Sequence, residues 1–230
     1  MLKIENLEVT GWEAAIRGMR NPKNSWNKSD TMIVDVPDTP RLDYSGNVVE
    51  VIPAHKQVVM RYEDENWNGI GANDLDLMKK LVKAGTDHSK FMRMINVTMD
   101  ITAPIYWISE HDTYKVGTTR NSCSFMHRGV SKEFSIEDFS FNSNNEKLLI
   151  ETIIPYLNDL RSTYLETKDE AVFESIRQLL PSGYNQRYTW QANYQVCRNI
   201  YKSRCNHRLK EWKDFCESLR NLPYSELITM

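Results

Sequence analysis

The chain has 230 residues, 40% of them hydrophobic, which is enough to bury a core, and we expect a single domain over residues 1–230. The formal net charge of −2 argues against a protein that coats a nucleic acid polymer, because phosphate binding shows as a basic excess. No apolar run reaches the roughly 18 residues that span a bilayer. The four cysteines lack the spacing of a zinc site, so we expect a soluble, cytoplasmic protein with reduced thiols, disulfides being the less favoured alternative.

Strand and helix patterns alternate in the first half of the chain. The spacing of apolar residues predicts strands over residues 2–9, 32–36, 47–52, 56–62 and 95–101, and helices over residues 12–20, 74–85 and 105–116. Asn73 or Asp74 is the expected cap of the second helix. Residues 117–128 form a polar loop, whose hydroxyl and basic groups make it a candidate contact for phosphate.

The second half is predicted to be helical. A short Ser-capped helix is expected within residues 131–141, followed by helices over residues 146–164, 170–180, 187–202 and 205–220. Because strands come first and helices later, the fold class is predicted to be α+β.

Residues 177–212 are rich in side chains that could bind a ligand. Arginines and asparagines are interleaved there with tyrosine and tryptophan. Arginine offers a fixed fork of donors to phosphate or to the edge of a planar ring, and asparagine offers both a donor and an acceptor. This composition predicts a site that holds something anionic and flat.

Fixed spacings in the same stretch resemble the flavin-dependent thymidylate synthases, also called thymidylate synthase complementing proteins. The pattern is Arg177-x-x-Leu180-Pro181, then Trp190-x-x-Asn193, then Asn199 five residues before Arg204. A second region, His88 followed by a strand and Ala103-Pro104, fits the same family, so that the resemblance covers roughly residues 75–215.

The resemblance implies a fold, an activity and an assembly. The fold would have a central mixed or antiparallel sheet with long helices packed against it. The activity would be that of an FAD-dependent methyltransferase, the reductive methylation of dUMP to dTMP, with methylenetetrahydrofolate and NADPH as co-substrates. FAD would carry carbon and hydride, so no protein nucleophile is needed. The assembly would be a cytoplasmic homotetramer that binds no membrane and no nucleic acid polymer.

The resemblance also implies site residues. Arg204 would be catalytic, binding the uracil edge and stabilising charge that develops on its carbonyl. The implied substrate-binding residues are Arg177, Arg204, Ser124 and Arg128. The implied cofactor-binding residues are His88, Lys115, Arg120, Asn121, Asn193 and Asn199. No metal ligand is implied.

One segment departs from the family pattern. Thr113-Tyr114-Lys115 stands where the family has Arg-His-Arg, so other bases of residues 115–128 would have to replace it. Two alternatives therefore stay open: a homologue that modifies a different pyrimidine deoxynucleotide, and a non-catalytic protein that only binds one or only assembles. Arg204 has its own alternative, a surface ion pair with Glu211 or Asp214.

Overall fold

The computed structural model describes residues 2–63, 66–123 and 130–230. The chain divides into two compact units, each assembled from three separate segments. The first unit comprises Met1–Glu8, Thr98–Ala192 and Arg204–Ser218, and the second comprises Val9–Val97, Asn193–Ser203 and Leu219–Met230.

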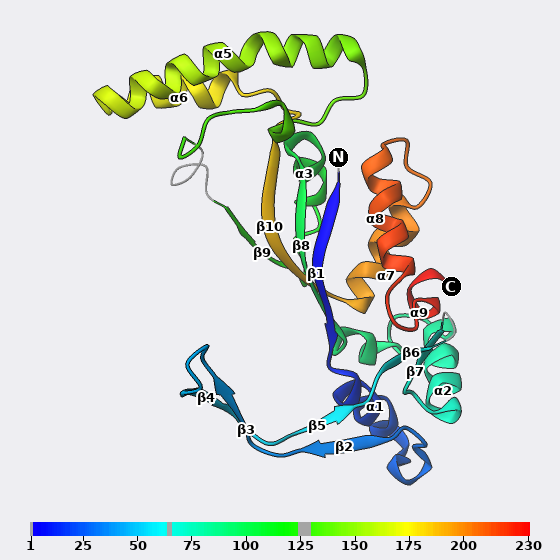
Figure 1. The fold of residues 1–230 in the computed structure, drawn as a ribbon. Helices are drawn as coiled ribbons and strands as arrows, with labels where there is room; N and C mark the ends of the chain where they lie inside the picture. Colours follow the sequence, from blue (N-terminus) through cyan, green and yellow to red (C-terminus); the bar gives the residue numbers. More distant parts are fainter. Residues whose placement is uncertain (1, 64–65, 124–129) are drawn as a thin grey trace. The chain divides into compact units, whose positions relative to one another are not determined.

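A four-stranded sheet lies mainly in the first unit (Figure 1). Its strand order is β1 (Lys3–Thr10), β8 (Asn96–Pro104), β10 (Asn185–Asn193) and β9 (Thr119–Ser122). β9 and β10 are antiparallel, with Arg120 opposite Trp190. Buried and half-buried residues alternate along β8, as expected for a strand whose two faces differ.

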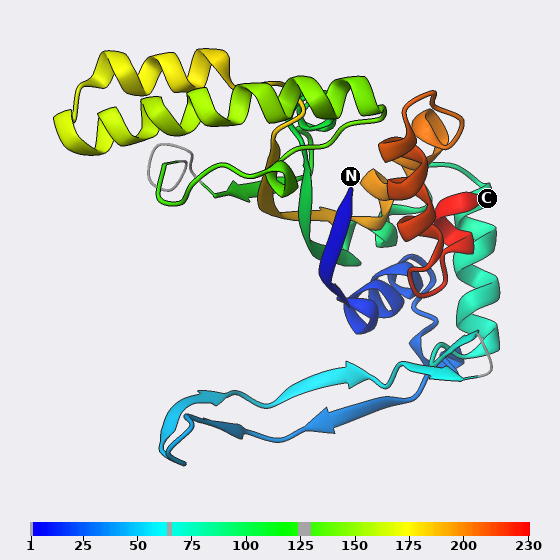
Figure 2. The same ribbon diagram turned by 45° about the horizontal axis from the view of Figure 1, so that its top comes forward.

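Helices complete the first unit. They are α3 (Ile105–His111), α5 (Asn144–Thr167), α6 (Glu170–Leu179) and α8 (Lys210–Arg220), with a 3-10 turn at Ile136–Asp138. α5 and α6 pack side by side as a helical hairpin (Figure 2). Their shared core contains Leu157, Phe173 and Ile176. Ser143 forms a capping box that starts α5, and Asp169 caps α6.

The turn after α6 also caps α3. The backbone N–H groups of Ile105 and Tyr106 donate to the carbonyls of Tyr184 and Ser182 at 3.0 and 3.1 Å. These N–H groups have no partner inside their own helix, so the turn satisfies them. In the same turn Gly183 allows a close approach to Ser140, whose N–H donates to the Gly183 carbonyl at 2.8 Å, because a Cβ there would lie 2.6 Å from the Ser140 carbonyl oxygen. The Arg177–Pro181 motif is thereby tied to the start of α3.

The second unit combines helices with three two-stranded ribbons. The helices are α1 (Trp12–Arg20), α2 (Ala72–Lys83), α7 (Tyr194–Arg204, its last residue in the first unit) and α9 (Glu226–Thr229), with 3-10 turns at Asn21–Lys23, Trp26–Lys28 and Lys90–Arg93. The ribbons pair β2 (Ile33–Val36) with β5 (His55–Val58), β3 (Thr39–Leu42) with β4 (Val48–Ile52), and β6 (Arg61–Glu63) with β7 (Asn66–Asn68). None of the helices within the described ranges is long and apolar enough to cross a membrane.

The first two ribbons follow each other as one extended arm, residues 33–58 (Figures 1 and 2). Its outer part carries apolar side chains that stay largely in solvent, among them Val48, Val49 and Val51 at 58%, 60% and 56% exposure. A two-stranded ribbon with no packed face is marginally stable by itself in water.

A buried carboxylate in α2 fixes the segment that leads into the arm. Asp74, fully buried in α2, accepts hydrogen bonds from Arg20 Nε, Ser29 Oγ and Thr31 Oγ1, each at 2.6 Å. Burial raises its pKa, but the three donors and the Arg20 charge outweigh burial, and the net pKa is lowered.

Several predicted elements are confirmed and others are corrected. The α+β class is confirmed, as are the first strand and the helices α1, α2, α5 and α6. The helix predicted over residues 187–202 is wrong in its first part, because β10 runs to Asn193 and only then does α7 begin. Neither Asn73 nor Asp74 caps α2; the cap is Gly71, and Asp74 is the buried carboxylate.

Three further boundaries differ. The strand predicted over residues 56–62 is split between β5 and β6. The helix predicted over residues 105–116 ends at His111, and β9 lies within the predicted polar loop. The last long helix begins at Lys210 rather than near residue 205.

Candidate active site

Arg204, the predicted catalytic residue, ends α7 in a small cluster of the first unit. Its Nε donates to the Tyr114 hydroxyl at 2.9 Å. Its guanidinium carbon lies 4.8 Å from the centroid of the Trp212 ring, close enough for a cation–π contact. No described residue accepts a hydrogen bond from Nη2. Nε and Nη1 are therefore committed to protein partners, and the Nη2 amino group is left for a ligand.

Glu110 is the acidic partner of this arginine. Its Oε2 lies 3.5 Å from Arg204 Nη1 and accepts a hydrogen bond from Trp212 Nε1 at 2.9 Å. His207 Nε2 is 3.9 Å from the same oxygen. The ion pair expected with Glu211 or Asp214 is not the one observed, because Glu211 accepts from the Tyr106 hydroxyl and Asp214 pairs with Lys210.

Arg120, predicted to contact the cofactor, is held by its own neighbours on and beside the sheet. It pairs with Asp112 and donates from Nη2 to Gln186 Oε1 at 3.1 Å. Its guanidinium carbon lies 4.3 Å from the centroid of the Tyr188 ring. These contacts engage both terminal nitrogens of the guanidinium, and the buried Nε has no partner among the described residues.

Beneath Arg120 lies a buried histidine surrounded by aromatic rings. His111 stacks on Trp107 with ring centroids 4.8 Å apart, and its Nδ1 is 3.0 Å from the Tyr188 hydroxyl. Burial, helped by the charge of Arg120, lowers its pKa from 6.5 to about 3. The imidazole is therefore neutral near pH 7, and its buried Nε2 has no partner among the described residues.

The other predicted residues of the first unit do not join the Arg204 cluster. Arg177 is exposed in the last turn of α6, and Lys115 is exposed after α3. Asn121 is exposed on β9, opposite Thr189 of β10. Ser124 and Arg128 lie outside the described residues.

Three predicted cofactor residues belong to the second unit. Asn199 is exposed on α7 and accepts from Gln195 Nε2 at 3.0 Å, while the buried Ser89 donates to Gln195 Oε1 at 3.3 Å. This chain of side chains links Asn199 to the residue next to His88, which is itself exposed. Asn193 is separate from it: its Oδ1 accepts from the Val196 N–H at 3.1 Å and caps α7.

Sequence reasoning missed Glu110, His111 and Tyr114 as site-forming residues. A signal was present, because Trp107, His111 and Tyr114 recur at the i, i+4, i+7 spacing of one helical face. The sequence pattern predicts that Ile105, Tyr106, Ile108 and Tyr114 pack inward. Ile108 is buried, but the other three are half-buried, and Trp107 and His111 are the buried residues that were not predicted.

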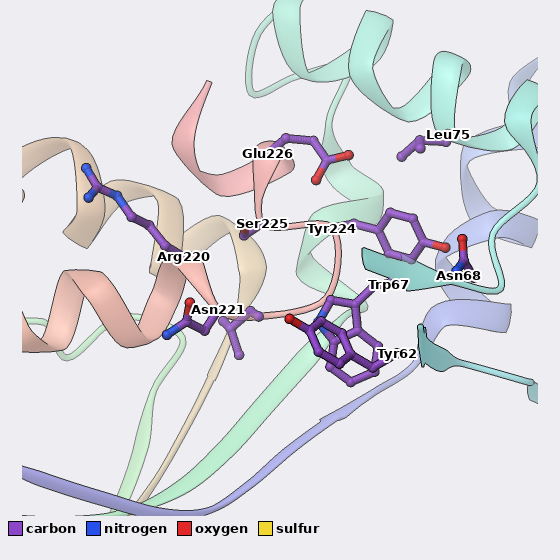
Figure 3. A pocket seen from close by; sticks show the side chains of 10 residues that line it. Tyr62, Trp67, Asn68, Leu75, Arg220, Asn221, Tyr224, Ser225 and Glu226 are labelled. Atoms are coloured by element: carbon purple, nitrogen blue, oxygen red, sulfur yellow. The ribbon is translucent and has the colours of Figure 1, made fainter. Parts of the chain in front are cut away.

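The second unit contains a separate cavity of about 690 Å³ (Figure 3). The rings of Tyr62 and Trp67, 5.2 Å apart on the β6–β7 ribbon, form one side, and the segment from Arg220 to Glu226 forms another. None of the predicted site residues lines it. A smaller cavity in the first unit, about 270 Å³, borders Tyr106 and the turn at Pro181–Gly183.

The family of the chain is shown by its sequence. A family model for the thymidylate synthase complementing proteins matches residues 39–224, and the chain belongs to this family of flavin-dependent thymidylate synthases. No curated protein sequence matches the chain significantly.

Two solved structures have the same fold. Thymidylate synthase X from Helicobacter pylori, solved with FAD and dUMP, superposes with a TM-score of 0.66 at 14% identity, covering 100% of this chain and 97% of that one. A flavin-dependent thymidylate synthase from Helicobacter pylori, also complexed with FAD and dUMP, matches with a TM-score of 0.66 at 15% identity, covering 98% and 97%. At these identities the likeness concerns the fold.

Proposed function

We propose that this protein is a flavin-dependent thymidylate synthase that converts dUMP to dTMP. Methylenetetrahydrofolate supplies the carbon, NADPH supplies the reducing equivalents, and FAD when bound mediates both transfers. The observation that carries the proposal is the family match over residues 39–224, which includes Arg204 and the cluster that holds it.

Arg204 acts on the pyrimidine in this proposal. With Nε bound to Tyr114 and Nη1 beside Glu110, the Nη2 edge donates to a carbonyl of the uracil ring. Such a donor is already oriented before the ring becomes more negative, so it stabilises the charge at little reorganisation cost. Arg177, exposed at the end of α6, binds the nucleotide phosphate.

The proposed cofactor-binding side chains each carry donors that a flavin dinucleotide would need. The exposed Asn199, held by Gln195, offers donors to a heterocycle edge, and the exposed Lys115 and His88 offer donors to phosphate or ring oxygens. Asn121 and Asn193 are the other proposed contacts. No thiolate is required, and burial raises the pKa of Cys197 to about 12.

We also propose a cytoplasmic homotetramer. The exposed apolar side chains of the arm at residues 33–58 support assembly, because a second copy of the chain would remove them from water.

A second candidate is a homologue that binds another pyrimidine deoxynucleotide, with or without modifying it. One observation favours it: Arg120, one of the bases that could replace the family's Arg-His-Arg, is already committed to Asp112 and Gln186.

The decisive experiment combines flavin absorbance with turnover. The purified protein should take up FAD and form dTMP from dUMP, methylenetetrahydrofolate and NADPH. Arg204→Ala should lower kcat/KM about 100-fold or more, as for other lost transition-state donors. Arg17→Ala, at an exposed position of α1, is the control. FAD uptake and nucleotide binding without any dTMP would favour the second candidate.

A further inference from the structure

We propose that Glu110 is a positioning residue that orients Arg204 and keeps it selective for a neutral pyrimidine edge over phosphate. The proposal rests on the proposed role of Arg204 in nucleotide binding. One oxygen of Glu110 contacts both partners: Oε2 accepts from Trp212 Nε1 at 2.9 Å and lies 3.5 Å from Arg204 Nη1.

The carboxylate is itself fixed. Glu110 sits in the last turn of α3, and its bond to Trp212 ties it to a fully buried indole of α8. The same indole forms the surface on which the Arg204 guanidinium lies. Glu110 and the face of Trp212 therefore both restrict the orientation of the guanidinium.

No other carboxylate of this cluster takes the role. Glu211 accepts from the Tyr106 hydroxyl at 2.6 Å, and Asp214 pairs with Lys210 on the exposed side of α8. Tyr114 holds only Nε, and a single hydrogen bond leaves the guanidinium free to swing about it.

The charge of Glu110 has a second effect. An unpaired arginine in a nucleotide site attracts phosphate at least as well as a ring carbonyl. A carboxylate 3.5 Å away offsets the positive charge and repels an incoming phosphate, but it leaves the Nη2 donor available to a neutral carbonyl. Glu110 thus disfavours a nucleotide bound in the reverse orientation.

Glu110→Gln tests both effects, because glutamine keeps the size and an acceptor for Trp212 but loses the charge. A first measurement needs no nucleotide: phenylglyoxal modification of arginines, mapped by mass spectrometry. We expect Arg204 to react about two- to fivefold faster in the variant, the range that loss of a partly exposed ion pair implies, with Arg187 of the same chain as the internal reference.

A second measurement uses calorimetry with inorganic phosphate and with dUMP. Glu110→Gln should bind phosphate more tightly and dUMP more weakly, opposite changes that general loosening of the structure would not produce. Glu110→Asp keeps the charge but moves the carboxylate away from Arg204. This variant should bind dUMP more weakly without binding phosphate more tightly. Asp214→Asn, which breaks the exposed pair with Lys210, is the matched control and should change neither affinity.

The results separate the two proposals. Equal Arg204 reactivity in wild type and Glu110→Gln, or unchanged phosphate affinity, would overturn the positioning role. Absence of dUMP binding by the wild type would instead overturn the proposed function, and the modification rates and phosphate affinities would still decide on Glu110.

Discussion

At the scale of single residues, the segment from Glu110 to Tyr114 supplies partners for two arginines that are distant in sequence. Glu110 and Tyr114 hold Arg204, and Asp112 holds Arg120. Between them His111 points into the aromatic core and stays neutral. Alternate side chains of one short segment thus hold two cations and help to build a core.

The neutral His111 should make stability depend on pH. Its pKa is about 3 in the folded chain and near 6.5 when unfolded, so below pH 6.5 the unfolded state binds the additional proton. This contribution to stability is complete above pH 6.5 and is lost as the pH falls toward 3. Thermal unfolding between pH 7.5 and 5 should show a fall in Tm that is smaller in His111→Phe. Equal slopes in wild type and His111→Phe would disprove this origin.

The buried Asp74 should be far more sensitive than its exposed neighbour. Asp74→Asn removes the charge that pairs with the nearly buried Arg20 and should cost about 3–5 kcal/mol of unfolding free energy. Asp76→Asn, on the same helix, breaks only an exposed pair with Lys80 and should cost less than about 0.5 kcal/mol. Denaturant titration of the two variants measures the difference, and similar losses would contradict the assigned role of Asp74.

At the scale of elements, the junction of β10 and α7 depends on one cap. Asn193 Oδ1 accepts from the Val196 N–H, so Asn193→Ala should cost about 1 kcal/mol of unfolding free energy. Asn193→Asp keeps the acceptor and should restore stability. Denaturant titration measures the cap, and FAD titration of both variants measures any contact with cofactor. If both variants bind FAD weakly but only the Asp variant regains stability, Asn193 contacts the cofactor as well as capping the helix. If the Ala variant is as stable as the wild type, Asn193 does not cap α7.

Amphipathic helices could be predicted from sequence where their apolar stripes are strongly periodic, as in α1 and α6. β10 could have been recognised too: Tyr188, Trp190 and Ala192 are buried while Thr189 and Gln191 between them are exposed, which is the period of a strand. Residues 187–202 were instead predicted to form one helix, so the strand was missed. The Glu110–Arg204 pair was out of reach, because it joins α3 to the end of α7 across more than 90 residues of chain.

At the scale of the whole molecule, the apolar arm should govern assembly. Val49 and Val51 lie on one face of β4, so lysine at both positions would place charges where a second copy is expected to pack. Light scattering should show a smaller particle for Val49→Lys/Val51→Lys than for wild type. Gln57→Lys adds a charge to the exposed β5 of the same arm and is the control. An unchanged mass for the double variant would show that this face takes no part in assembly.

The interleaving of the two units has a consequence for how the chain is made. The first unit needs residues up to Ser218 and the second needs the segment Leu219–Met230, so neither is complete before α8 has been synthesised. Domains that are continuous in sequence fold one after the other during synthesis, but here β1 must wait until residues up to Ser218 have been synthesised. A protein of this design should therefore acquire its structure in one late step, and fragments ending anywhere in the middle should remain substrates for proteases and chaperones.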